Sequence, residues 1–203
     1  MSSQKSREVP AAAQPTRQRG HLRVAAILDA ATALFATRDY DAVTMTEIAA
    51  RSATAIGSLY RFFPTKELLA DALLARYGER LEAELAELAE RAGRLSAAEL
   101  AAGICDTIEA RAIERSAAVT LVEARSNTGA QRARIRTLML DRLRSIVSAA
   151  NPELSIGDLE VRAKVLLGLV KVITINAEWA DDDVRAETRR LIEVYIAARI
   201  MRS

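Results

Sequence analysis

The stretch TMTEIAARSATAIGSLYRFFPTKELL, which runs from Thr44 to Leu69, decides the fold of this chain. Its apolar residues recur at helical spacing in two short segments, which a break at 52–54 separates. Thr44 stands three residues before Glu47, which is the spacing of a capping box at a helix start. Pro64 ends the second segment, because proline cannot continue a helix. Two short helices joined by such a brief break predict a helix-turn-helix.

The outward side of this motif has the residue types that contact DNA. The second helix of a helix-turn-helix lies in the major groove, where short hydroxyls and cations reach phosphates and base edges. We therefore assign DNA contacts to Thr44, Thr46, Thr54, Gly57, Ser58, Tyr60, Arg61 and Lys66. Tyr60 and Lys66 are assigned to phosphates. Ser58 and Arg61 are assigned to base edges. The apolar side that holds the two helices together is predicted to consist of Ile48, Ile56, Leu59 and Phe63.

Helical spacing continues across the rest of the chain, and no segment alternates polar and apolar residues as a strand would. The pattern predicts an all-α fold of about nine helices, with a three-helix N-terminal DNA-binding domain and a C-terminal helical domain for ligand binding and dimerisation. We expect a flexible basic tail over 1–20, the DNA-binding domain over 21–67 and the second domain over 68–203. Outside the motif, helices are predicted over 22–37, 65–91, 97–115, 117–126, 130–149, 156–179 and 182–201.

Composition and charge favour a cytoplasmic protein over a secreted or membrane protein. Half of the residues are hydrophobic, yet no apolar run of membrane-spanning length occurs, so no membrane association is expected. The single cysteine, Cys105, cannot form an internal disulfide and is expected to pack in the core. The net charge is +2, but residues 1–70 carry nine basic and six acidic residues, so the N-terminal module is basic enough to attract phosphates.

Nine positions of the opening stretch match a known pattern at the right spacing: Thr44, Ile48, Ala49, Gly57, Leu59, Tyr60, Phe63, Lys66 and Leu69. On these residues the sequence resembles the TetR family of repressors, and the resemblance covers residues 22–70. It implies a DNA-binding repressor that forms dimers. The chain departs from the pattern in the turn, where Ser52-Ala53-Thr54-Ala55 replaces Ala-Gly-Val-Ser. We expect strain at Ala53, which lacks the freedom of glycine at positive φ, and we expect that Thr54 can replace Ala55 as the helix cap.

The helices beyond the motif supply candidates for a dimer interface. The predicted helix over 156–179 is apolar on nearly all sides, and burial by a second subunit is the simplest explanation. The interface is assigned to Leu166, Leu169, Val170, Ile173, Leu191 and Tyr195. A two-fold homodimer would present two reading helices about one DNA turn apart, which suits a near-palindromic operator.

Large apolar side chains on the middle helices indicate a pocket for a small-molecule effector. The pocket is assigned to Tyr77, Ile104, Ile108, Leu121, Met139 and Trp179. We expect a largely apolar effector, because an unpaired charge is costly to desolvate in such a cavity. Glu109 and Glu123 leave one alternative open, a cationic effector oriented by a carboxylate. Ligand binding is expected to act through helix 65–91, whose start adjoins the reading helix.

Features of enzymes and metal proteins do not stand out in this sequence. No nucleophile with its base, no metal-ligand spacing and no glycine-rich phosphate loop occurs. We therefore expect no enzymatic activity, no cofactor and no metal site. Asp181, Asp182 and Asp183 are interpreted as the favourably charged start of a helix. The expected function is a ligand-responsive DNA-binding repressor. The alternative left open is a helical interaction or ligand-binding protein whose degenerate helix-turn-helix does not bind DNA.

Overall fold

The computed structural model describes residues 16–124, 129–175 and 182–201, and within these ranges all regular structure is helical. The predicted all-α fold class is confirmed. The elements are α1 (Thr16–Phe35), α2 (Met45–Arg51), α3 (Ile56–Phe62), α4 (Lys66–Arg91), the 3₁₀ turn η1 (Ala92–Arg94), α5 (Ala97–Glu109), α6 (Ala112–Ala124), α7 (Gly129–Ala150), α8 (Ile156–Ile175) and α9 (Asp182–Arg199). None of the helices in these ranges is long and apolar enough to cross a membrane.

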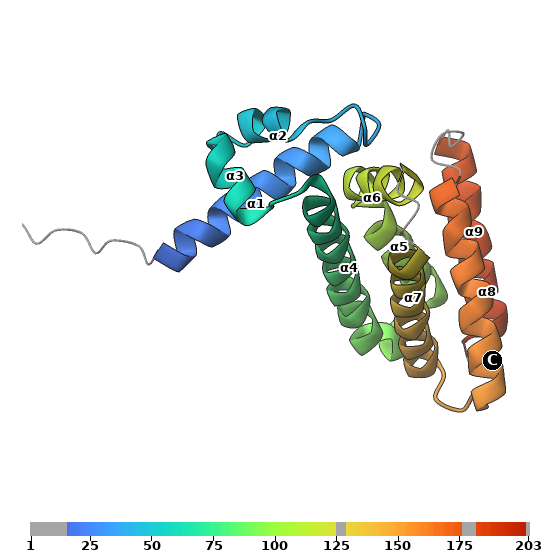
Figure 1. Cartoon of the computed structure of the whole chain (residues 1–203). Helices are drawn as coiled ribbons and strands as arrows, with labels where there is room; N and C mark the ends of the chain where they lie inside the picture. Colours follow the sequence, from blue (N-terminus) through green and yellow to red (C-terminus); the bar gives the residue numbers. More distant parts are fainter. Residues whose placement is uncertain (1–15, 125–128, 176–181, 202–203) are drawn as a thin grey trace, which may run out of the picture.

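The helices form two groups, an N-terminal unit of α1–α3 and a body of α4–α9, as Figure 1 shows. The long helix α4 begins directly after α3 and runs down the body, where it packs mainly against α7. Helix α6 lies across the end of the body that is nearest to the N-terminal unit, and it packs against α1. Helices α8 and α9 lie side by side at the edge of the body farthest from α4. The N-terminal unit therefore meets the body through α4 and α6.

Helix α1 forms the centre of the N-terminal unit. Ile27, Ala31 and Phe35 of α1 are fully buried, and they meet Ile48 of α2 and Leu59 of α3 in the same apolar core. Burying an aliphatic or aromatic side chain of this size contributes roughly 1.5–3 kcal/mol, so the shared core stabilises the packing of the three helices. The core fixes the orientation of α3 relative to α1 and α2.

Two helix boundaries differ from the sequence-based prediction. Helix α1 begins at Thr16 rather than at Leu22, so residues 16–20 of the expected tail are helical. Arginine and glutamine are good helix formers, and Gln18 and Arg19 are exposed in this first part of the helix. The predicted helix over 97–115 is divided at Ala110 and Arg111 into α5 and α6. No glycine or proline marks this break. It coincides with a tertiary contact, in which the Arg111 guanidinium donates to Glu84 of α4.

Candidate nucleic-acid interface and effector cavity

Helix α2 starts with the capping box that the sequence predicts. The Thr44 hydroxyl accepts a hydrogen bond from the Glu47 amide at 3.2 Å, and Glu47 Oε2 accepts one from the Thr44 amide at 2.8 Å. Arg38 adds an ion pair of 2.7 Å to Glu47 Oε1. This Arg38 hydrogen bond, followed by those from Thr44, lowers the pKa of Glu47 to about 2. Thr44 is exposed, but its hydroxyl is already engaged within the chain.

The turn between α2 and α3 is strained and weakly capped. Ala53 has a φ of 49°, and it is the only non-glycine residue with positive φ in the described part of the chain. The expected departure at Ala53 is confirmed, and the left-handed conformation costs an alanine roughly 1–2 kcal/mol. Ala55 is the N-cap of α3 and makes no side-chain cap hydrogen bond.

Two predictions about Thr54 are wrong. Thr54 does not replace Ala55 as the cap, since α3 begins at Ile56 with Ala55 before it. Thr54 does not face the groove either: it is buried, and its hydroxyl donates to the Ser52 carbonyl at 3.3 Å. A buried hydroxyl needs a hydrogen-bond partner, and Thr54 finds its partner within the turn itself.

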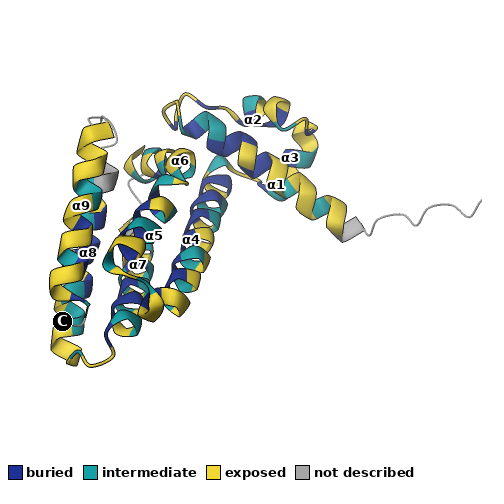
Figure 2. Cartoon of the chain, turned by 180° about the vertical axis from the view of Figure 1, so that it is seen from behind, coloured by how far each residue is buried: buried dark blue, intermediate teal, exposed yellow. Residues whose placement is uncertain are grey.

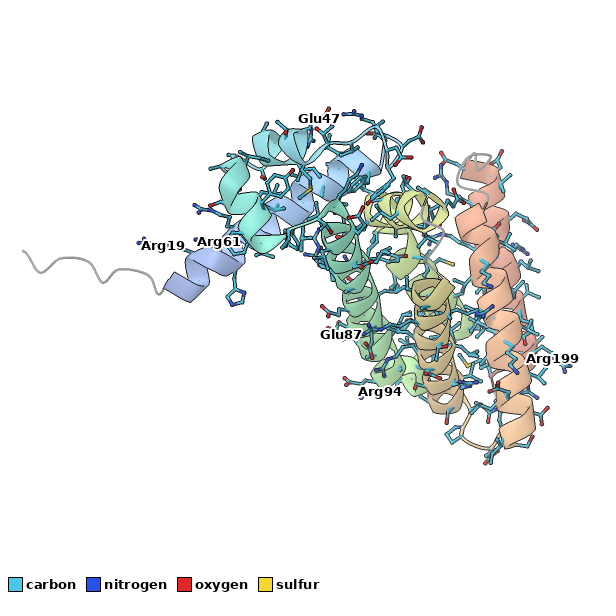
Figure 3. The ribbon with its side chains drawn as sticks, viewed as in Figure 1. Arg19, Glu47, Arg61, Glu87, Arg94 and Arg199 are labelled. Atoms are coloured by element: carbon cyan, nitrogen blue, oxygen red, sulfur yellow. The ribbon has the colours of Figure 1, made fainter. Side chains whose placement is uncertain are left out.

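The outward face of α3 carries small and cationic residues. Gly57, Tyr60 and Arg61 are exposed and Ser58 is half-buried, while Thr46 is exposed on α2. Figure 3 shows Arg61 projecting outward from the N-terminal unit. A Cβ atom added at Gly57 would meet no atom of the chain within 4 Å. The missing side chain at Gly57 is therefore not required by internal packing, and it leaves the backbone open to an external surface.

The inward face of the motif agrees with the prediction at three of four positions. Ile48, Leu59 and Phe63 are buried and hold α2 and α3 together. Ile56 is the exception, because 42% of its surface is exposed. It occupies the first position of α3, where the side chain points outward, so its assignment to the apolar side is corrected.

The Lys66 ammonium contacts the N-terminal unit, unlike that of a lysine that is free in solvent. Its ammonium donates to the Tyr40 carbonyl and lies 4.1 Å from the centre of the Tyr40 ring. Burial lowers the pKa of Lys66 from its usual value. Lysine has three N–H donors, so a phosphate contact would have to share the ammonium with Tyr40.

Comparison with known proteins agrees with this geometry. The family model for "Bacterial regulatory proteins, tetR family" matches residues 27–73, from the core of α1 to the first turns of α4. The N-terminal unit of the chain thus matches the TetR family over these residues. The HTH-type transcriptional repressor KstR of Rhodococcus jostii is 46% identical over 56 residues, which are 28% of this chain and 26% of that protein. KstR of Mycolicibacterium smegmatis is 43% identical over 58 residues. The match thus spans about a quarter of the length of these curated relatives.

Solved structures extend the likeness to the whole TetR-family fold. A TetR-family transcriptional regulator from Streptomyces coelicolor has a TM-score of 0.59 at 24% identity, over 87% of this chain and 99% of that chain. A transcriptional regulator from Rhodococcus sp. has a TM-score of 0.65 at 23% identity, over 88% of this chain and 94% of that chain. These likenesses place the body helices in the fold that the N-terminal match indicates.

The body contains an open cavity of about 570 Å³, which is lined by residues of α4, α5, α6, α7 and α8. Tyr77, Ile108 and Met139, which were assigned to the pocket, line this cavity. Ile104 and Leu121 do not line it, because their side chains are fully buried in the surrounding core. Trp179 lies outside the described residues.

The charged residues at the cavity differ from those that the sequence suggested. Glu109 is paired with Arg189 of α9 and Glu123 is exposed, so neither of them lines the cavity, and the cation-orienting role is corrected. The lining includes Arg115, Arg136 and Lys171, which sequence reasoning did not single out. A signal for Arg115 existed in its helical spacing, since it shares one face of α6 with Ala118, Val119 and Val122.

The assigned dimer residues are divided between two faces of α8 and α9. Leu166 and Val170 are buried within the protomer, so their assignment to the interface is corrected. Leu169 and Tyr195 are half-buried, Leu191 is half exposed, and the Ile173 side chain lies outside the described set. The outer surface instead exposes three valines, Val161, Val165 and Val194. Figure 2 shows much of the outside of α9 as exposed.

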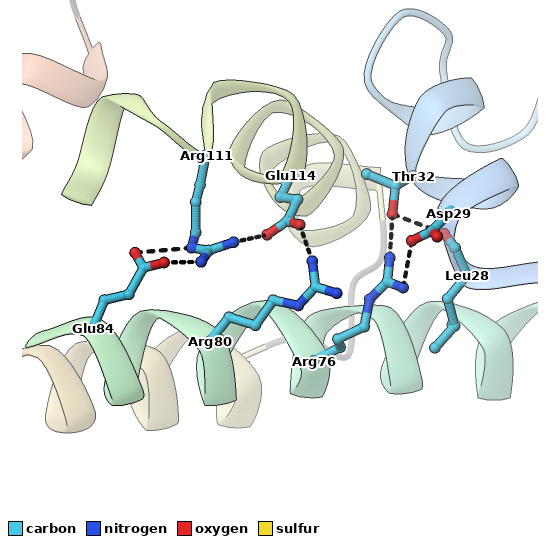
Figure 4. Close-up of polar contacts among 8 residues, drawn as sticks. All are labelled: Leu28, Asp29, Thr32, Arg76, Arg80, Glu84, Arg111 and Glu114. Atoms are coloured by element: carbon cyan, nitrogen blue, oxygen red, sulfur yellow. Dashed lines mark hydrogen bonds and ion pairs between the residues drawn. The ribbon is translucent and has the colours of Figure 1, made fainter. Parts of the chain in front are cut away.

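Polar contacts connect the body to the N-terminal unit (Figure 4). Arg76 of α4 pairs with Asp29 of α1 at 2.7 Å and donates to the Thr32 hydroxyl at 3.0 Å. Further along, Glu114 of α6 pairs with Arg80 of α4 at 2.5 Å. Helix α6 also contacts α1 directly, because the Ser116 hydroxyl donates to the Ala36 carbonyl at 2.9 Å. Both α4 and α6 therefore join the cavity to α1.

Two further predictions concern residues outside these sites. Cys105 is fully buried in α5, and burial raises the pKa of its thiol to about 11, so the predicted core position is confirmed. Asp182 and Asp183 lie in the first turn of α9, as the interpretation of a favourably charged helix start requires, while Asp181 lies outside the described residues. Across the described ranges, no group of three or more potential metal ligands comes together.

Proposed function

We propose that this protein is a ligand-responsive transcriptional repressor that binds a near-palindromic DNA operator as a homodimer. The observation that carries the proposal is the outward face of α3, where the open backbone at Gly57 lies beside the exposed Tyr60 and Arg61. A helix with such a face fits the major groove, which admits an α-helix and presents hydrogen-bonding base edges. The resemblance of the N-terminal unit to repressors named KstR supports the same function.

The candidate DNA contacts fall into two groups. Ser58 and Arg61 on α3 are the candidates for base edges, and Tyr60 with Thr46 are candidates for phosphates, since all four remain accessible. Thr44 and Lys66 are weaker candidates, because the hydroxyl of Thr44 and the ammonium of Lys66 already have partners within the chain. Thr54 is removed from the set because it is buried.

The homodimer is proposed to form through the outer surface of α8 and α9. Val161, Val165, Leu191 and Val194 are each between 42% and 60% exposed, and they lie on two helices that pack against each other. Contiguous exposed apolar surface of this kind marks interaction sites in proteins. A two-fold arrangement would pair this surface with its own copy and present two α3 helices to DNA.

The cavity is proposed to hold the effector that controls DNA binding. Its volume lies within the range of about 300–1,000 Å³ that small-molecule sites occupy. An effector that prefers one arrangement of α4 and α6 would shift α1 through the Arg76–Asp29 and Ser116–Ala36 contacts. The effector can shift the free energy of this equilibrium by no more than the difference between its binding free energies for the two arrangements.

Fluorescence anisotropy with a labelled duplex from the DNA upstream of its own gene tests the proposal. We expect saturable binding of two subunits per duplex, and binding to a scrambled duplex at least about a thousandfold weaker. Circular dichroism of the same preparation measures its helical content and so shows whether the protein is folded. If the folded protein binds neither duplex, the alternative applies: a helical interaction protein without DNA binding.

A further inference from the structure

We propose that the effector is an amphipathic monoanion, with an apolar body and one carboxylate that Arg115 binds inside the cavity. The inference rests on the proposed function of the cavity as the effector site, and it specifies the class of ligand. It refines the largely apolar effector expected from the sequence by adding one negative charge, because the cavity has apolar walls and a cationic group within them.

The charge around the cavity has one sign. Three helices contribute one cation each: Arg115 from α6, Arg136 from α7 and Lys171 from α8. No aspartate or glutamate is among the described residues that line the cavity. Arg136 and Lys171 are exposed, whereas Arg115 is half-buried. An anion would therefore be attracted by the exposed cations and meet Arg115 farther inside.

Arg115 is the group in this cavity that lacks a partner. Its Nη1 atom is buried and makes no hydrogen bond within the described part of the chain. A buried N–H donor without an acceptor is costly, and a cationic donor is more costly than a neutral one. A neutral apolar ligand would leave this nitrogen unpaired and would also exclude water from it. A carboxylate would accept its hydrogen bond and neutralise its charge.

The nearest acidic residue on α6 is already used elsewhere. Glu114 pairs with Arg80 at 2.5 Å through Oε1 and with Arg111 at 3.2 Å through Oε2. Arg111, one turn before Arg115, is thus paired with Glu114 as well as with Glu84. Arg111 therefore has a carboxylate from α4 and one from α6, whereas Arg115 has none among the described residues. We propose that the partner of Arg115 is the effector.

The rest of the lining determines the body of the ligand. Leu81, Ile108, Met139 and Val170 form apolar walls from four different helices. Tyr77 lies near Arg115, whose charge opposes the effect of burial on the pKa of the Tyr77 phenol, and both residues line the cavity. A single carboxylate matches the single inner guanidinium, and an aliphatic chain or ring system matches the walls.

Isothermal titration calorimetry on the full chain tests the inference with three probes of equal chain length: decanoate, 1-decanol and decylammonium. We expect decanoate to bind at least about tenfold more tightly than decanol, and decylammonium to bind most weakly. Equal affinity for decanoate and decanol would overturn the proposal, as would a preference for decylammonium. This comparison uses the unmodified protein, so it does not depend on whether a variant folds.

Variants then assign the preference to Arg115. In Arg115→Met the ratio of decanoate to decanol affinity should fall to about twofold or less, while Arg115→Lys should keep an intermediate preference because it retains the charge. Arg94→Met, which changes an exposed arginine of η1 far from the cavity, is the matched control and should keep the full ratio. An undiminished ratio in folded Arg115→Met would overturn the assignment.

DNA binding is measured on the same samples so that the two proposals can fail separately. Release of the operator duplex by decanoate, and not by decanol, supports both the ligand class and the regulatory role. Selective binding of decanoate without any effect on DNA supports the ligand class and contradicts the effector role. Release by decanol at the same concentration as decanoate supports the effector role and overturns the ligand class.

Discussion

The α1–α3 unit and the α4–α9 body arrange charge and apolar surface in opposite ways. In the N-terminal unit, Ile48 and Leu59 are buried and Arg61 projects outward. In the body, Val161 and Val194 lie outside, and Arg115 places a guanidinium nitrogen inside. The arrangement in the N-terminal unit is the usual one for a folded protein in water, whereas that in the body is unfavourable unless a partner covers the valines and pairs with the guanidinium. The partners that we propose follow from this difference: an anionic polymer outside α3, an aliphatic surface outside α8 and α9, and a small anion within the cavity.

The largest expected effect concerns the aliphatic surface of the body. Leu191→Glu places two carboxylates in the proposed two-fold interface, where each would be desolvated without a partner. We expect a monomer by sedimentation velocity, and a loss of operator affinity of about a hundredfold or more, since one subunit would contact only half of the operator. Ile113→Glu on α6 changes an even more exposed aliphatic residue away from this surface, and the variant should remain a dimer. A dimeric Leu191→Glu would remove α8 and α9 as the interface.

The next effect concerns the open backbone of α3. Gly57→Ala adds a methyl group that meets no atom of the protein, so thermal stability should stay equal or rise slightly. Operator affinity should fall by about tenfold, because the methyl group would hold the helix away from the base edges. Gly78→Ala on α4 also meets no atom within 4 Å and serves as the matched control with unchanged DNA affinity. If Gly57→Ala binds as tightly as the unmodified protein, the backbone at Gly57 does not approach DNA.

A smaller effect is expected at the strained turn between α2 and α3. Ala53→Gly should raise the free energy of unfolding by about 1 kcal/mol, because glycine adopts a φ of 49° without steric cost. In a chain of this size the melting temperature should increase by roughly 2–4 °C. Ala50→Gly, in the exposed helical part of α2, should change stability in the opposite direction by a similar amount, about 1 kcal/mol. A destabilised Ala53→Gly protein would contradict the backbone geometry described for the turn.

The smallest effect is the pH dependence of the α2 capping box. Folding lowers the pKa of Glu47 from 4.5 to about 2, chiefly through Arg38. The stability that Glu47 contributes is therefore complete above pH 4.5 and is lost as the pH falls towards 2. Urea unfolding across this interval should show a shallower decline for Glu47→Gln than for the unmodified protein. Glu87→Gln, an exposed residue of α4, should follow the unmodified protein. Parallel curves for all three proteins would refute the role given to Glu47.

Local signals in the sequence were sufficient for the N-terminal unit and for most helix starts. The Thr44–Glu47 pair predicts the start of α2. A capping box can be recognised in the sequence because it lies within four consecutive residues. The positive φ of Ala53 was also predictable, because this alanine stands at a turn position where the family pattern has glycine. Thr54 was misassigned because its outward or inward direction depends on how the turn closes, which spacing alone does not determine.

The body was less predictable because its sites depend on which side of each helix packs inward. The stretch of α8 over 165–170 is apolar at every position, so the sequence did not distinguish Leu166, which packs inside, from Val165, which lies outside. Size and apolarity likewise did not separate Ile104 in the core from Met139 at the cavity. The break before α6 has no local signal, because it is made by the contacts of Arg111 with another helix.

The salt dependence of operator affinity tests the proposed function at the level of the whole molecule. Fluorescence anisotropy over about 50 to 300 mM salt should give a linear plot of log affinity against log salt concentration, with a slope of about −4 or steeper for the dimer. Lys66→Ala should make the slope shallower by less than about one unit per subunit, because Tyr40 already shares the ammonium, and it should weaken binding equally on all sequences. A flat dependence for the unmodified protein would contradict phosphate binding by the N-terminal unit, and with it the proposal that α3 reads DNA.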